Sequence, residues 1–163
     1  MRVIGVDPGY DKFGVAILEK RNGQDILIFS DCLRSSAKLP FSERLFTIGS
    51  DFQHLIEKFK PDALAIEKLF FTTNQKTAMG VSEIKGIATY IAKVNGLKTY
   101  EYTPLQVKMA MVGYGKANKD QVSKMVPLLI KNFSEFKKNK IEDDEFDACA
   151  IALTCLATER VAK

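Results

Sequence analysis

The chain has 163 residues, 46% of them hydrophobic, and a formal net charge of +4 at pH 7. This length suits a single globular domain spanning residues 1–163, and no apolar run approaches the ~20 residues of a membrane-spanning helix. Asp7 and Asp11 interrupt the apolar N-terminus, which argues against a signal peptide, and three cysteines without a CxxC pair are typical of free thiols in a reducing cytoplasm. Composition therefore argues against a membrane protein and a disulfide-stabilised secreted domain and favours a cytoplasmic protein.

The N-terminal part of the chain is expected to form three antiparallel strands. The first covers residues 2–7, where an apolar run ends at Asp7 and Pro8-Gly9 requires a turn. Two more strands are expected at residues 13–20 and 26–33, joined by a hairpin turn. Asp7 therefore lies at the carboxyl end of a buried strand, where a carboxylate is costly to desolvate unless a cation meets it.

Helices and strands alternate in the rest of the chain. Apolar residues at helical spacing and capping signals predict the boundaries. Helices are expected at residues 42–59, 74–95, 104–112, 119–130 and 143–158, with strands at 63–66 and 98–102. This order predicts an α/β fold whose five-stranded mixed sheet has an antiparallel hairpin at one edge, parallel strands beside the first strand, and helices on its faces.

The positive charge of the chain is concentrated in one segment. Residues 101–140 contain eight lysines and three acids, so this segment carries +5 and the rest of the chain −1. A basic segment beside an acidic site suits a polyanion that reacts at that site. A lysine-rich face that is simply solvated would give the same count.

Four acids lie at positions where they can converge. Asp7 and Glu67 end buried strands, and Asp147 continues the apolar face of the last helix. Its partner on that helix is Asp144 at i,i+3 or Asp143 at i,i+4, and spacing alone leaves this open. Carboxylate oxygens with open positions suit Mg²⁺ or Mn²⁺, and two such ions ~4 Å apart can drive phosphoryl displacement. Acids at these positions can also be capping groups.

Several stretches resemble the RuvC family of Holliday-junction resolvases. They appear in the order and at the spacing of that family over nearly the whole chain. The stretch Thr-Pro-Leu-Gln-Val-Lys followed by Gly-Tyr-Gly-Lys-Ala-Asn-Lys is specific, whereas Asp-Pro-Gly after a strand is weak alone. The matching stretches are residues 4–9, 65–67, Phe70, 102–108, 113–119 and 144–152.

The resemblance implies a ribonuclease-H-like fold, a homodimer, Mg²⁺-dependent cleavage of four-way DNA junctions, and association with the RuvA–RuvB branch-migration machinery. It places the catalytic and metal-binding carboxylates at Asp7, Glu67, Asp144 and Asp147, which selects Asp144 over Asp143. It also places functional lysines at Lys108 and Lys119, and a DNA-contacting aromatic residue at Phe70.

Lys108 and Lys119 can stabilise charge at the scissile phosphate, or can simply position the DNA backbone. In the glycine-rich loop, Lys116 and Tyr114 are also expected to contact DNA. Phe70 can stack on an unpaired base, although core packing is the alternative for the aromatic residues after Glu67.

The chain departs from the family pattern at a few positions. Lys68 stands where an uncharged polar residue is common, and Lys85 where an arginine is common. Glu145-Phe146 replaces two small residues between the last acids. None of these departures falls on a catalytic position, but Phe146 could alter packing there.

The long helix at residues 74–95 is a candidate dimer interface, because a two-fold symmetric junction suits a two-fold symmetric enzyme. Its apolar stripe is larger than a peripheral helix requires. The alternative is that this stripe covers the sheet. The stripe consists of Ala78, Val81, Ile84, Ala88 and Ile91.

Three other functions compete with this interpretation. An actin-like phosphotransferase also uses an Asp-x-Gly turn after its first strand, but it needs a second phosphate loop and about twice this length. A non-catalytic junction-binding protein would not be expected to keep four acids near phosphates. A ribonuclease-H-like nuclease acting on RNA is disfavoured moderately by the basic segment from Lys108 to Lys119.

Overall fold

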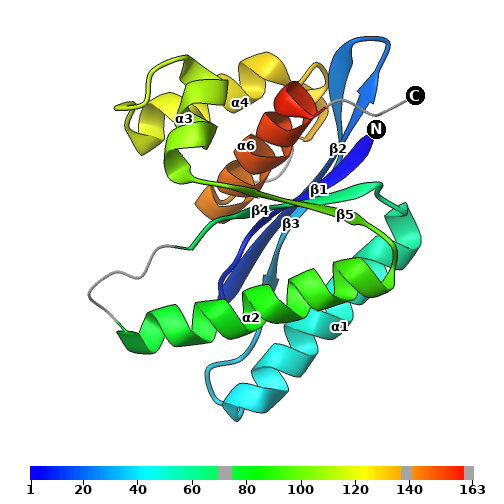
Figure 1. Ribbon diagram of the computed structural model, residues 1–163, viewed down its shortest axis with the longest axis vertical. Helices are drawn as coiled ribbons and strands as arrows, with labels where there is room; N and C mark the ends of the chain where they lie inside the picture. The colour runs from blue at the N-terminus through cyan, green and yellow to red at the C-terminus, as the bar shows by residue number, and fades with distance from the viewer. Residues whose placement is uncertain (70–74, 137–140, 160–163) are drawn as a thin grey trace.

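A five-stranded mixed sheet forms the centre of the fold (Figure 1). This computed structural model describes residues 1–69, 75–136 and 141–159. The strands are β1 (Arg2–Asp7), β2 (Lys12–Arg21), β3 (Gln24–Arg34), β4 (Ala63–Glu67) and β5 (Lys98–Tyr102), in the spatial order β3-β2-β1-β4-β5. The pairs β1–β2 and β2–β3 are antiparallel, and β1–β4 and β4–β5 are parallel. The predicted mixed sheet with an antiparallel edge is confirmed.

Helices cover both faces of this sheet (Figure 1). On one face lie α1 (Phe41–Phe59) and α2 (Gln75–Val94), which pack against each other. On the other face lie α3 (Pro104–Val112), α4 (Lys119–Leu129), the single-turn α5 (Phe133–Phe136) and α6 (Asp143–Thr158). The chain therefore forms three layers, with the sheet between two layers of helices.

Strand alternation divides the core into two clusters. Ile4 and Val6 of β1 belong to the cluster shared with α1 and α2, whereas Val3 belongs to the cluster shared with α6. Every residue of α6 from Ala148 to Leu156 is buried. A helix that is apolar on all sides is typical of a core element, and α6 is the helix that packs most closely on the sheet.

Glycines allow this close approach of α6. A Cβ atom at Gly5 would lie 2.3 Å from the carbonyl oxygen of Ala148, and one at Gly14 would lie 2.2 Å from that of Asp144. Gly14 is the β2 partner of Asp7 in the β1–β2 pairing. The first turn of α6 therefore rests directly on the strand next to Asp7.

Most predicted boundaries are confirmed to within one or two residues. Thr103 and Asn118 cap α3 and α4 by accepting hydrogen bonds from the Gln106 and Gln121 backbone N–H groups, at 3.2 and 2.9 Å. The sequence did not predict α5, which lies inside the lysine-rich segment. Its single turn is too short to show a helical period, and packing of Phe133 in the core holds it in place.

The apolar stripe of α2 covers the sheet. Ile84 and Ala88 are only 1% exposed and belong to the core cluster under α1 and α2. The expectation that this stripe forms an interface is therefore wrong for these two residues. Other apolar side chains of α2 are exposed, among them Tyr90 and Val94.

The three cysteines, Cys32, Cys149 and Cys155, are buried free thiols, as the sequence predicted. Within the three described segments, no helix is both long enough and apolar enough to cross a bilayer.

Candidate active site

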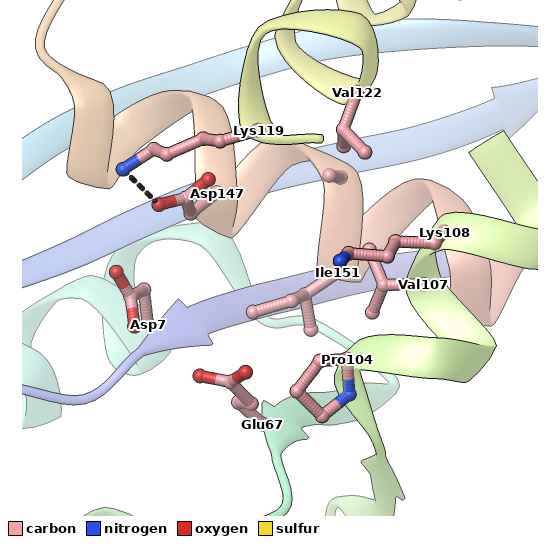
Figure 2. Close-up of a pocket in the computed structure, with 10 residues that line it drawn as sticks. Asp7, Glu67, Pro104, Val107, Lys108, Lys119, Val122, Asp147 and Ile151 are labelled. Atoms are coloured by element: carbon pink, nitrogen blue, oxygen red, sulfur yellow. Dashed lines mark ion pairs between the residues drawn. The ribbon is translucent and has the colours of Figure 1, made fainter. Parts of the chain in front are cut away.

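The ends of β1 and β4 bring two acids together. These strands are parallel, with Val6 paired to Ile66, so the next residues, Asp7 and Glu67, leave the same edge of the sheet. Val3 and Ala65 face the cluster of α6. Because side chains alternate along a strand, Asp7 and Glu67 are on the same face of the sheet as these two residues. Figure 2 shows Asp7, Glu67 and Asp147 of α6 around one cavity.

This cavity has a volume of about 200 Å³. Its polar lining consists of the three acids together with Lys108 of α3 and Lys119 of α4 (Figure 2). The structure therefore gathers five of the predicted site residues from five different elements.

The opposite part of the cavity wall is apolar, which sequence reasoning missed. Pro104 and Val107 of α3, Val122 of α4 and Ile151 of α6 line it. Pro104 and Val107 are three residues apart on one helix face, and Ile151 is one turn after Asp147. This spacing was a usable signal, but apolar residues at helical spacing are normally assigned to the core.

Lys119 forms the main ion pair of the site. Its Nζ lies 2.8 Å from Asp147 Oδ2 (Figure 2) and 3.7 Å from Asp143 Oδ2. The hydrogen bond to Asp147 is the main cause that raises the pKa of Lys119. The cap at Asn118 fixes the start of α4, so Lys119 is held where it can face α6.

The site has more negative charge than these lysines neutralise. Burial and then the charges of Asp147, Glu67 and Asp144 raise the pKa of Asp7 from 3.8 to about 7, and Lys119 opposes this only in part. Burial and Asp147 also raise the pKa of Glu67, although Lys85 and Lys119 act in the opposite direction. Crowded carboxylates with raised pKa values indicate a place that favours additional cations.

The structure separates the two candidate partners of Asp147. The Asp143 side chain is 84% exposed, whereas that of Asp144 is 29% exposed. The charge of Asp144 is one of those that raise the pKa of Asp7. Asp144 does not line the cavity. Its Oδ2 lies 3.9 Å from the Nζ of Lys12, a residue that sequence reasoning did not single out.

An acidic cluster that could hold a metal ion is present beside Asp144. Ligand atoms of Cys32, Glu142 and Asp144 all lie within 4.8 Å of one another. Arg34 and Lys12 already pair with Glu142. Of the two acid-rich places, the cavity at Asp7 has the stronger need for a cation.

The predicted DNA-contacting residues lie in different places. Tyr114 is 54% exposed in the loop between α3 and α4, and Lys116 is exposed in the same loop. Neither lines the cavity. Phe70 and Phe71 lie outside the described residues.

Comparisons with known proteins show the family of the chain. The family profile "Crossover junction endodeoxyribonuclease RuvC" matches residues 3–155. Proteins of that description from Caldanaerobacter subterraneus subsp. tengcongensis and Halothermothrix orenii are 40% and 42% identical, each over 94% of this chain and 90% of the relative. The structure of T. thermophilus RuvC in complex with a Holliday junction substrate superimposes with a TM-score of 0.87 at 30% identity, covering 96% of this chain and 93% of the other. The ribonuclease-H-like fold expected from the sequence is confirmed.

Proposed function

The chain belongs to the RuvC family of crossover junction endodeoxyribonucleases, and we propose on this basis that it resolves four-way DNA junctions by paired symmetric nicks. The observation that carries the proposal is the convergence of Asp7, Glu67 and Asp147 on one cavity beside Lys108 and Lys119. Such a site suits hydrolysis of a phosphodiester, whose transition state gathers negative charge.

The donor set fits Mg²⁺, with Mn²⁺ as a substitute. All donors at the cavity are carboxylate oxygens, which these hard ions prefer. Burial and the neighbouring carboxylates raise the pKa of Asp7, and Lys119 offsets this only in part, which supports a place for added cations. We assign as the ligands of two ions Asp7, Glu67 and Asp147, which line the cavity, together with Asp144, which lies outside its lining but whose charge acts on Asp7. When bound, such ions would neutralise charge and activate water in phosphoryl displacement.

The two lysines complete the reaction site from the helical layer. Lys119 Nζ is paired with Asp147 in this structure, yet its side chain is 58% exposed. It can therefore donate to a phosphate oxygen that enters the cavity without leaving the acid. Lys108 lies on the other side of the cavity (Figure 2), where it can hold the adjacent phosphate.

The flanking segments suit a DNA substrate. Tyr114 and Lys116 project from an exposed loop next to the two helices that carry Lys108 and Lys119. We assign this loop, with Phe70, to contacts with the junction. Lysines there supply phosphate contacts, and aromatic side chains supply stacking on opened bases.

We further propose that the enzyme acts as a homodimer through the groove between α1 and α2. Leu45, Phe46, Tyr90 and Ile91 line this groove, and Phe46 and Tyr90 are each 70% exposed. Exposed aromatic side chains at one groove are typical of an interaction site. A second copy is the partner that a two-fold symmetric junction requires for matched nicks. Action in the cytoplasm and association with RuvA–RuvB stay predictions.

The decisive experiment is nicking of a labelled synthetic four-way junction in Mg²⁺ by the wild type, Asp7→Asn and Asp143→Asn. We expect paired nicks from the wild type and from Asp143→Asn, whose acid is exposed, and none from Asp7→Asn with junction binding retained. Linear duplex and an RNA–DNA hybrid are the control substrates. Binding without nicking in Mg²⁺ or Mn²⁺ would support a non-catalytic junction-binding protein, and preferred cleavage of the hybrid would support a nuclease acting on RNA.

A further inference from the structure

The position of Asp144 and Asp147 depends on how the first turn of α6 is held. Backbone N–H groups in the first turn of a helix have no partner within the helix, so they are satisfied by capping side chains or by water. The backbone N–H of Glu142, at the start of α6, donates to Glu145 Oε1 at 3.0 Å. Glu145 thus closes the first turn that contains Asp144.

The second carboxylate oxygen of Glu145 reaches across to the sheet. Ser30 Oγ on β3 donates to Glu145 Oε2 at 2.7 Å, a contact between residues 115 positions apart. Glu145 is only 9% exposed, and no lysine or arginine of the described residues lies within ion-pair distance of it. A buried carboxylate without a cation is costly, so these two hydrogen bonds are what keeps it in place.

Two more contacts hold the same turn from its other sides. The Glu142 carboxylate pairs with Arg34 at the end of β3 and with Lys12 at the start of β2, the latter at 3.3 Å. Below the turn, Gly14 lets the backbone of Asp144 approach β2 closely. Of these contacts, that of Glu145 is the side-chain link made by a buried acid, since Lys12, Arg34 and Glu142 are more exposed and Gly14 contributes only close backbone packing.

We infer that Glu145 is a positioning residue of the active site. Its carboxylate links the Glu142 N–H to Ser30 and so fixes where α6 presents Asp144 and Asp147 to Asp7. This inference rests on the proposed function, in which these acids bind the metal ions. Glu145 itself touches neither the cavity nor its lysines. It is also one of the positions at which this chain departs from the family pattern.

The test compares Glu145→Ala, Ser30→Ala, the double variant and Glu145→Gln. The readouts are the Mg²⁺ concentration for half-maximal nicking, Mn²⁺ binding to the protein without DNA, junction binding without metal, and the melting temperature. We expect Glu145→Ala to weaken metal binding about 10-fold, the lower end of the effect of residues that orient metal ligands. Junction binding should be unchanged.

Two comparisons separate positioning from simple destabilisation. Glu145→Gln should stay close to the wild type, because its amide oxygen can accept from Glu142 and its amide group can donate to Ser30. The double variant should lose no more metal affinity than Glu145→Ala, because both single changes break the same link. Asp120→Ala is the matched control, since it removes a first-turn acid of α4 whose ion-pair partner, within the described part of the chain, is Lys124.

The outcomes are distinguishable. A lower melting temperature with unchanged Mg²⁺ and Mn²⁺ dependence would overturn the inference and leave Glu145 a purely structural residue. If Glu145→Ala fails to fold, Ser30→Ala, which removes one hydroxyl group, decides by the same readouts. A wild type that never nicks junctions would refute the proposed function, whereas the Mn²⁺ binding data would still test Glu145.

Discussion

Gly14→Ala is the sharpest test of how the fold positions the acids proposed to be catalytic. Gly14 lies opposite Asp7 in the sheet, and its missing side chain admits the first turn of α6. Its backbone is not among the positive-φ glycines, so alanine can adopt the same conformation. The substitution therefore acts through one steric contact.

The size of that contact can be read from the structure. The new Cβ would lie 2.2 Å from the carbonyl oxygen and 2.6 Å from the carbonyl carbon of Asp144. Restoring an ordinary 3.4 Å contact requires a movement of about 1.2 Å. Because both atoms are backbone, no rotamer change can relieve the clash. Overpacking of this kind costs about 1–3 kcal/mol, and a shift of ~1 Å in reacting groups can cost about 100-fold in rate.

The assay is the nicking rate of a four-way junction at saturating Mg²⁺, with junction binding and the melting temperature measured in parallel. We expect a loss of about 100-fold in rate with binding retained. Gly86→Ala is the matched control, since a Cβ there meets nothing within 4 Å on α2. If the Gly14→Ala protein folds and its nicking rate stays within about three-fold of the wild-type rate, instead of falling about 100-fold, Gly14 does not position the acids through this contact.

Three further predictions follow from the charges and surfaces. Without metal, wild-type stability should fall as the pH rises from about 4 to about 7, because the native state keeps a proton on Asp7, whose pKa is raised to about 7. Asp7→Asn should reduce this slope, to which Glu67 also contributes, and should be more stable than the wild type at pH 8 by up to about 4 kcal/mol. Urea unfolding in EDTA at about pH 4 and at pH 8 is the measurement. Lys119→Met should slow nicking about 100-fold with little change in junction binding, whereas the control Lys124→Met, also on α4, should not. Phe46→Glu should convert a dimer into monomers in sedimentation experiments and uncouple the two nicks, and a dimer that persists in this variant and in Tyr90→Glu would exclude the groove as the interface.

Local signals were sufficient to predict much of the fold and of the site. Asp7 and Glu67 each follow a short apolar run, and a run that ends in an acid marks the carboxyl end of a strand. The start of α6 is marked by acids that suit a helix N-terminus. These signals lie within a few residues of the side chain in question, so no knowledge of the tertiary structure was needed.

Contacts between distant segments could not be predicted in this way. Spacing alone left Asp143 and Asp144 equivalent, and only the resemblance to the family selected Asp144. In the structure Asp143 is exposed and Asp144 lies near Lys12. The Glu145–Ser30 link joins residues 115 positions apart, and α5 depends on packing of Phe133 against Phe146 at 5.7 Å between ring centroids. Each of these depends on which elements become neighbours, information that hydrophobic periodicity does not contain.

The electrostatics of the site also imply an order of events. Asp7, Glu67 and Asp147 line the cavity, and among the described residues Lys108 and Lys119 are the cations that line it with them. Burial and then the charges of Asp147, Glu67 and Asp144 raise the pKa of Asp7 to about 7. A scissile phosphate would add a further negative charge to a place that already repels one. On the proposed function, divalent cations enter before the phosphate or together with it, while lysines outside the cavity hold the DNA backbone beforehand. Junction binding and cleavage thus depend on different groups. Loss of an acid should therefore abolish nicking and leave binding intact.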